Sequence, residues 1–427
     1  MRTPSLLLAL ACSPLGAAPR EDWTQAELEA MSTEIQAQLE ELRGERFVRP
    51  VEVRLASTED LVRYMKERFA KTESPEKVAA DEVIAKLLAV IPTDMDLMET
   101  TFALLETQVG GFYDPDTDSF SLMDQCPKAV APMTLAHELD HALDDQLFSI
   151  DGKLLPIALL TDRATAFMSV AEGSGTNVMY QWQLRHGAEI DVAAAMEMQA
   201  EAQAGMAAAP MWMWKPMLAV YMRGSCFLTR TDNLMSGLAT PATPADIRAA
   251  FEQPPLSTEQ VLHPEKYWDP EQRDDPVIVA IDTGALPAGW KVLREDVLGE
   301  LMLATVLTPG AATAGLDLSN PMAALAIEYT NDRAAGWGGD ALVLVGSGEG
   351  RFLRLVTVWD SARDAGEFYG GLQTLLPQLE AAASALSDRD SNAGVTLEYG
   401  PGEDAVVFTS WFSVDRRDLR KLSDALR

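Results

Sequence analysis

Residues 137 to 141 read His-Glu-Leu-Asp-His, so two histidines stand four positions apart with a glutamate directly after the first. Positions four apart lie one above the other on a helix, and both imidazoles can then reach one metal ion. Zinc is the metal that this spacing favours. Bound zinc activates a water molecule for hydrolysis, and Glu138 would accept the proton of that water. The motif therefore predicts a hydrolytic zinc site with His137 and His141 as ligands and Glu138 as general base.

A hydrolytic zinc site needs a third protein ligand and an open position for water. The segment 161–182 has a helical pattern, and it places Glu172 31 residues after His141. Gly173 and Gly175 lie beside this glutamate and would let its helix approach the first helix closely. We therefore expect Glu172 to be the third ligand. The competing candidates for this position are His186, Asp162 and Glu189.

The segment 132–147 is expected to be the helix that carries the histidines. At about 100° per residue, both histidines and most of its acids fall on one face, and the opposite face is apolar apart from Gln146. Pro132 suits the first turn of a helix. Asp145, one turn beyond His141, is a candidate for orienting a ligand.

A hairpin is predicted directly before this helix. Residues 108–123 read as two short strands around an Asp-Pro-Asp-Thr-Asp turn. The three alternating acids of the turn resemble a calcium loop, but the EF-hand pattern requires Gly at Ser119 and Glu at Gln125. We therefore expect a structural turn at this position.

The wider chain is 47% hydrophobic and 23% charged, which is typical of a globular protein. Its length of 427 residues indicates two domains or one large domain with a substantial appendage. A helix is expected from residue 21 to Arg43, with Gly44 as its end, followed by a strand at 51–55. The Pro-rich and charged residues 253–276 indicate a domain boundary. Beyond it we expect helices at 292–307 and 361–386 and strands at 341–345, 352–359 and 405–412. This mixture predicts an α+β fold, with domains at 21–270 and 276–427.

The charge balance and the first residues bear on partners and location. With 34 Lys and Arg against 65 Asp and Glu, the net charge of −31 disfavours nucleic acids as partners. Residues 1–18 carry Arg2, a short apolar run and small residues, as export signals do. Cys12 follows Ala-Leu-Ala, which is similar to a bacterial lipoprotein box. The protein is expected to be exported, either secreted or held at the cell envelope by a lipid on Cys12.

The remaining cysteines, Cys126 and Cys226, form an even pair that an oxidising compartment could join. Two buried free thiols are the alternative. The segment 196–222 is rich in Met and Trp, which is more typical of a core or an apolar contact surface than of a copper site.

These motifs together resemble the zinc metallopeptidases of the gluzincin type, and more closely a family of exported bacterial proteins. The resemblance rests on HELDHALDDQ, AEGSGT, YMRGSCF, PPLSTEQVLHPEKY and GWGGD. It implies a zincin-like catalytic domain over 21–270, with Glu172 as ligand and the strand Gly110–Tyr113 as a platform for a peptide or protein substrate. The metzincin continuation is absent, since Asp144 and Leu147 replace its Gly and His. Thr176 stands where the thermolysin-type helix has Asp.

Peptidases of this type also need a donor for the developing oxyanion. His263, Tyr221 and Tyr267 are the candidates, and for each a purely structural role is the alternative. The sequence thus favours a zinc-dependent peptide-bond hydrolase followed by a C-terminal α+β domain. The competing interpretation is a non-enzymatic envelope or binding protein with a structural or vestigial metal site. Oligomeric state is not encoded in any of these patterns.

Overall fold

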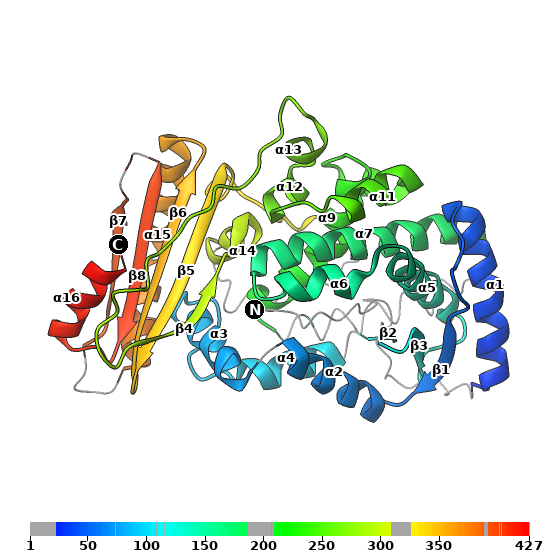
Figure 1. Cartoon of the computed structure of the whole chain (residues 1–427), viewed down its shortest axis with the longest axis horizontal. Helices are drawn as coiled ribbons and strands as arrows, with labels where there is room; N and C mark the ends of the chain where they lie inside the picture. Colours follow the sequence, from blue (N-terminus) through cyan, green and yellow to red (C-terminus); the bar gives the residue numbers. More distant parts are fainter. Residues whose placement is uncertain are drawn as a thin grey trace.

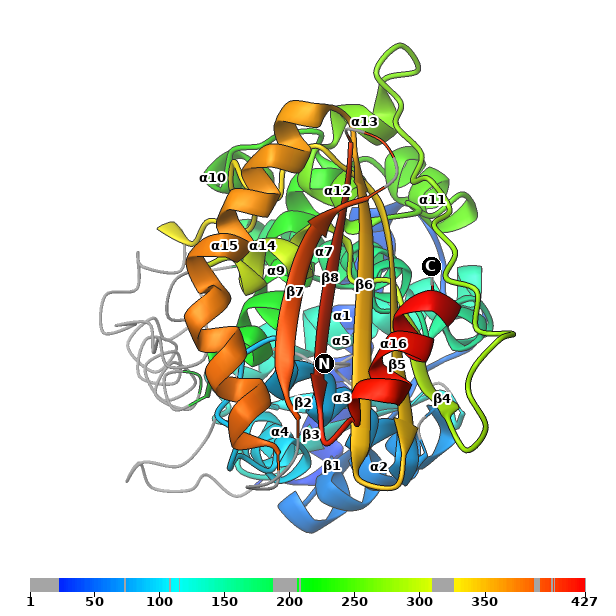
Figure 2. The same cartoon turned by 90° about the vertical axis from the view of Figure 1, so that its left-hand side faces the viewer.

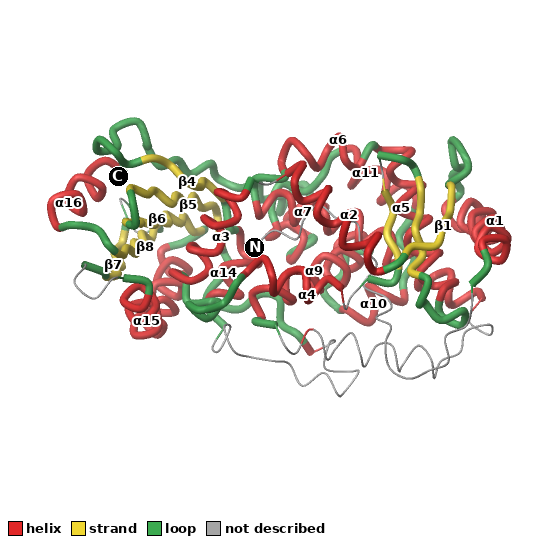
Figure 3. The backbone as a smooth tube through the Cα atoms, turned by 90° about the horizontal axis from the view of Figure 1, so that it is seen from below, coloured by secondary structure: helices red, strands yellow, loops and turns green. Residues whose placement is uncertain are grey.

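The computed structural model describes residues 23–72, 74–106, 109–114, 116–186, 206, 209–308, 326–387, 392–400, 402 and 404–426. The expected signal 1–18, its Cys12 and the candidate ligand Glu189 lie outside these ranges. The fold is a mixture of helices and two sheets, which confirms the α+β class (Figure 1). The molecule is elongated, with α1 (Gln25–Arg43) at one end and the C-terminal sheet at the other (Figure 3).

The N-terminal elements follow the local signals of the sequence. Helix α1 begins with a capping box between Thr24 and Glu27 and ends at Gly44, whose φ of 64° suits glycine. The next elements are β1 (Glu52–Ala56), α2 (Thr58–Thr72), α3 (Pro75–Leu87) and α4 (Leu97–Glu106). The predicted helix end at Arg43 and the predicted strand are both confirmed.

The first sheet has three strands in the order β1-β3-β2. Strands β2 (Gly111–Asp114) and β3 (Ser119–Met123) form the predicted antiparallel hairpin. Strand β1 pairs in parallel with β3, so β2 lies at an edge of the sheet.

Helices fill the middle of the molecule. They are α5 (Ala131–Phe148), α6 (Ile150–Leu154), α7 (Thr161–His186), α9 (Met211–Leu228), α10 (Leu234–Ala239), α11 (Pro244–Glu252), α12 (Thr258–Leu262) and α13 (Glu265–Trp268), with a 3-10 turn at Leu155–Ile157. Helices α7 and α9 touch through their backbones, because a Cβ atom on Gly173 would lie only 2.3 Å from the carbonyl carbon of Gly224. Among the described helices, none is long and apolar enough to cross a membrane. Cys126 and Cys226 are both buried and free.

The second sheet has the order β4-β5-β6-β8-β7, and all of its pairings are antiparallel. Its part of the chain comprises β4 (Lys291–Asp296), α14 (Gly299–Val306), β5 (Trp337–Ser347), β6 (Gly350–Trp359), α15 (Ala362–Ala385), β7 (Gly394–Tyr399), β8 (Ala405–Phe412) and α16 (Arg416–Ala425). Helices α15 and α16 lie against the sheet (Figure 2). The expected strands and the long helix α15 are confirmed. The helix expected at 292–307 is wrong in its first part, where pairing with β5 makes a strand of residues 291–296.

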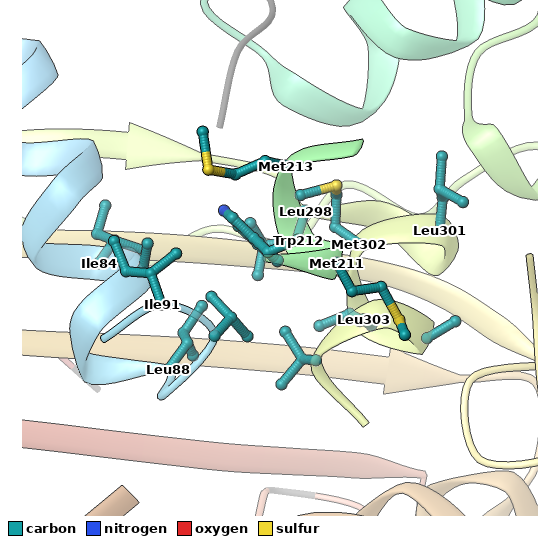
Figure 4. Packing of buried hydrophobic residues seen from close by; sticks show 14 of the residues in the cluster. Ile84, Leu88, Ile91, Met211, Trp212, Met213, Leu298, Leu301, Met302 and Leu303 are labelled. Atoms are coloured by element: carbon teal, nitrogen blue, oxygen red, sulfur yellow. The ribbon is translucent and has the colours of Figure 1, made fainter. Parts of the chain in front are cut away.

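One face of this sheet packs against helices from the N-terminal part of the chain. Leu342 and Leu344 belong to the same hydrophobic cluster as residues of α3, α9 and α14, whereas Val343 and Val345 face the other way and pack with α16. Figure 4 shows part of this cluster, where Trp212 of α9 lies between Ile84 of α3 and Leu298, which directly precedes α14. The two parts of the chain on either side of residues 253–276 therefore share one core.

Candidate metal centre

Helix α5 holds the His-Glu-Leu-Asp-His motif deep in the protein. It begins at Ala131, with Pro132 in its first turn as expected. Its apolar side packs in a hydrophobic cluster with residues of α1 and α7. His137 is 2% exposed, and Glu138 and His141 are fully buried. The motif is thus placed on a helix whose position is fixed by packing on its opposite side.

The two histidines and Glu172 converge on one point. His137 Nε2 and His141 Nε2 are 2.9 Å apart, and each lies 3.2 Å from Glu172 Oε2. Donor atoms around a tetrahedral zinc ion at its usual bond lengths are separated by about 3.3 Å. The three side chains chosen from the sequence are therefore brought together with nearly the spacing that one zinc ion requires.

The charges of these three groups depend on one another. Burial lowers the pKa of His137, and the neighbouring His141 lowers it further. Burial also acts to lower the pKa of His141, but the carboxylate of Glu172 outweighs it and raises that pKa to about 9. Burial acts to raise the pKa of Glu172, yet the two imidazoles hold it below its usual value. A buried carboxylate facing two imidazoles is a donor set that suits zinc.

Two glycines allow helix α7 to bring Glu172 into this position. A Cβ atom on Gly175 would lie 2.9 Å from Cε1 of both His137 and His141, so the imidazoles pack directly on the backbone of α7. Gly173 provides the close contact with α9 described above. The predicted close approach of α7 to the histidine helix is thus found at Gly175, whereas Gly173 approaches α9 instead.

We expect Gly175→Ala to weaken zinc binding by at least about tenfold, because the added methyl group must displace one of the two imidazoles. Gly370→Ala is the matched control, since a Cβ atom on this residue of α15 meets nothing within 4 Å. Competition with a chelating dye measures the zinc dissociation constant, and circular dichroism verifies the fold. A folded Gly175→Ala variant with unchanged zinc affinity would contradict the packing argument.

Glu138 lies next to the three ligands. One of its carboxylate oxygens falls within 4.8 Å of ring nitrogens of both histidines. This places the carboxylate close enough to contact a water molecule held at the same point. The geometry is compatible with the role of general base that the motif predicts.

A buried ionic cluster beneath the ligands was not foreseen from the sequence. Arg43 of α1 donates to Asp144 at 2.7 Å and also pairs with Asp140, which accepts a hydrogen bond of 3.0 Å from the Ser174 hydroxyl. All three charged side chains are at most 3% exposed. The signal was present in the sequence, because two acids four positions apart on the histidine face of α5 need a cation once that face is buried.

Asp145 has a different place from the one expected. It accepts hydrogen bonds from the backbone N–H of Ile150 at 2.8 Å and from the Tyr113 hydroxyl at 3.2 Å. These contacts connect the end of α5 to strand β2. The acids that lie beneath the metal ligands are Asp140 and Asp144.

Of the three candidate oxyanion donors, the structure brings only Tyr221 to the ligands. Its ring stacks on that of His137, with centroids 5.9 Å apart. His263 Nε2 lies 3.0 Å from Glu300 Oε1, and the Tyr267 hydroxyl donates to the carbonyl of Gln253. Neither of these contacts involves His137, His141 or Glu172.

The competing third ligands also lie elsewhere. The ring of His186 stacks on Trp182 at the end of α7. Asp162 accepts two hydrogen bonds from Thr258, and burial raises its pKa to about 7. Of the described candidates for the third ligand, Glu172 is the one that reaches both histidines.

The expected substrate strand is present as the edge strand β2. The register with β3 points the backbone groups of Gly111 and Tyr113 away from that partner, toward the side of β2 that no described strand pairs with, and all four residues of β2 are buried. The Tyr113 carbonyl accepts a hydrogen bond of 3.1 Å from the Tyr64 hydroxyl of α2, whose ring stacks on Phe112. One of the outward positions of the edge is thus occupied by α2.

Comparison with known proteins matches the C-terminal part of the chain. Residues 290–418 match a family model described as a domain of unknown function, DUF8575. No curated protein and no solved structure matches the chain. The match covers the C-terminal sheet, and the helices α5 and α7 that carry the metal centre precede it.

Proposed function

We propose that this protein is a zinc-dependent peptide-bond hydrolase with a zincin-like catalytic region. The observation that carries the proposal is the convergence of His137 Nε2, His141 Nε2 and Glu172 Oε2 at separations of 2.9 to 3.2 Å. Two histidines from one helix and a glutamate from a second helix are the ligand set of gluzincins, which the sequence resembles. The buried glutamate of the motif adds the base that hydrolysis needs.

Each residue of the site has a separate proposed role in hydrolysis. Zinc bound at this position would polarise the scissile carbonyl and make the attacking water more acidic. Glu138 takes the proton of the water and transfers it to the leaving amine. Tyr221, whose ring lies against that of His137, would donate a hydrogen bond from its hydroxyl to the developing oxyanion.

The proposed substrate is a peptide or protein segment that pairs with the open edge of β2. The proposal also includes export, from the signal pattern of residues 1–18, with Cys12 as the site of a lipid anchor. Nucleic acids are poor partners for a chain with a net charge of −31.

Burial favours a second candidate function. The four side chains of the site are at most 2% exposed, whereas a catalytic zinc needs an open position that water and substrate can reach. A structural or vestigial metal site in a non-enzymatic envelope or binding protein would have no such need. The two candidates differ in whether metal loading brings hydrolysis.

Removal of the metal tests both candidate functions. We expect about one zinc ion per chain by elemental analysis, cleavage of a mixed peptide library detected by mass spectrometry, loss of cleavage with 1,10-phenanthroline, and its return when zinc is added back. Zinc that stabilises the fold without any cleavage would favour the second candidate. A folded chain that binds no zinc would contradict the hydrolase and the structural metal site, and would leave the vestigial site.

A further inference from the structure

A cavity of about 390 Å³ lies beside the first turns of α9, at a distance from the metal ligands. It is bounded by α9 on one side and by Thr308 and residues 326–328 and 330–331 on the other. Met211, which lines it, lies beside Leu303 of α14 (Figure 4). Lys215 precedes Tyr221 by six positions, about 9 Å along a helix. The cavity is therefore separate from the proposed catalytic site.

The cavity contains a buried cation. Lys215 is 3% exposed, and burial lowers the pKa of its ammonium group to about 8. It forms no ion pair with a carboxylate in the described part of the chain, and the charge that acts on it is that of Glu328, an exposed residue. A lysine buried in this way costs free energy unless an acceptor reaches it.

A second polar group of the lining, the indole of Trp214, has no acceptor among the described residues. The indole Nε1 of Trp214 is buried and makes no hydrogen bond with any described residue. The other polar lining groups are engaged, because Thr308 and Asn331 both donate to the carbonyl of Ala304, and the Thr330 hydroxyl bonds to Glu300. Among the described residues, the lining therefore has an indole N–H without an acceptor and an ammonium group without a carboxylate partner.

We propose that this cavity binds a small monocarboxylic acid with an apolar body. The carboxylate would pair with Lys215 and accept a hydrogen bond from Trp214, and the hydrocarbon or aromatic body would contact Met211 and Ile327. Glu328 lies among the lining residues and is exposed to solvent, so it disfavours a second negative charge on the ligand. The site favours acids over neutral molecules because of Lys215. It favours monoacids over diacids because of the repulsion from Glu328.

Isothermal titration calorimetry with 3-phenylpropanoate tests the proposal, and the uncharged 3-phenylpropanamide has nearly the same shape. We expect saturable binding of the acid at pH 7 and at least about tenfold weaker binding of the amide, because only the acid can pair with the ammonium group. Phenylsuccinate, a dicarboxylate, is expected to bind more weakly than the monoacid. Affinity for the acid should fall as pH rises from 7 to 10, since the deprotonated amine no longer attracts it.

Substitutions test whether the acid binds in this cavity or elsewhere on the protein. Lys215→Met keeps the length of the side chain, removes the buried charge and should lower the affinity for the acid at least tenfold. The control Lys291→Met changes an exposed lysine and should leave the affinity unchanged. Zinc-free protein should bind the acid as well as the zinc form does, which keeps this result independent of hydrolysis. Equal binding of acid and amide, unchanged affinity in a folded Lys215→Met variant, or no binding of the acid would overturn the proposal.

Discussion

Glu138→Gln is expected to lower kcat/KM for peptide hydrolysis by about 10²- to 10⁴-fold while leaving zinc bound. Glutamine has nearly the same shape as glutamate but cannot take the proton of the attacking water. The substitution does not remove any of the three converging atoms, which belong to His137, His141 and Glu172. Initial rates on one defined peptide and the zinc content of the same preparation measure the two effects separately.

Two further variants test whether the loss of activity is specific to Glu138. Glu41→Gln makes the same change at an exposed carboxylate of α1, so it should leave the rate near that of the wild type. Glu172→Gln should instead reduce zinc affinity, because it removes the charge of a ligand. A Glu138→Gln enzyme that retains the wild-type rate would contradict the proposed role of this residue.

The largest effect on stability is expected for Arg43→Met, which should lower the free energy of unfolding by about 3–5 kcal/mol. Arg43 is the cation that pairs with Asp140 and Asp144, and both carboxylates are fully buried. Its removal leaves two negative charges without a partner in the interior. Urea denaturation monitored by circular dichroism measures the change.

Two comparisons test the electrostatic origin of this loss. Replacing both acids by asparagine in the Arg43→Met background should recover part of the stability, because the uncompensated charges are then absent. Burial raises the pKa of Asp144 to about 6 although Arg43 lowers it, so loss of Arg43 raises this pKa further, and the folded variant binds the proton more tightly than the unfolded chain does. The cost of the charged carboxylate is therefore present above that pH and is relieved below it. A deficit of Arg43→Met that is no smaller at pH 5 than at pH 8 would argue against this explanation.

Local patterns predicted much of the candidate site. The His-Glu-Leu-Asp-His motif determined the face of α5, and the glycines beside Glu172 indicated where a second helix approaches. The hairpin β2–β3 followed from its turn residues. In each case the residues that made the prediction possible are a few positions apart in the sequence. Over so short a distance, residue spacing constrains the geometry of a helix or a hairpin.

The remaining features depend on contacts between distant segments. The pairing of Arg43 with the α5 acids joins α1 to a helix about a hundred residues later, and no periodicity encodes such a partner. His263 was a reasonable candidate by residue type, but its neighbour Glu300 lies 37 positions away and defines a different environment. Residues 291–296 form a strand because β5 is available to pair with them, which local propensity does not reveal.

The long-range contact of Arg43 also has a consequence for the order of folding. Arg43 and Asp140 are separated by 97 positions, and the entropy of closing so long a loop must be paid before their attraction is gained. The hairpin and the individual helices involve only near neighbours in sequence and can form earlier. Burial of the acids beneath the metal ligands therefore belongs to a late step of folding, when α1 docks on α5. We therefore expect Arg43→Met to slow the docking of α1 on α5 more than the formation of the hairpin β2–β3.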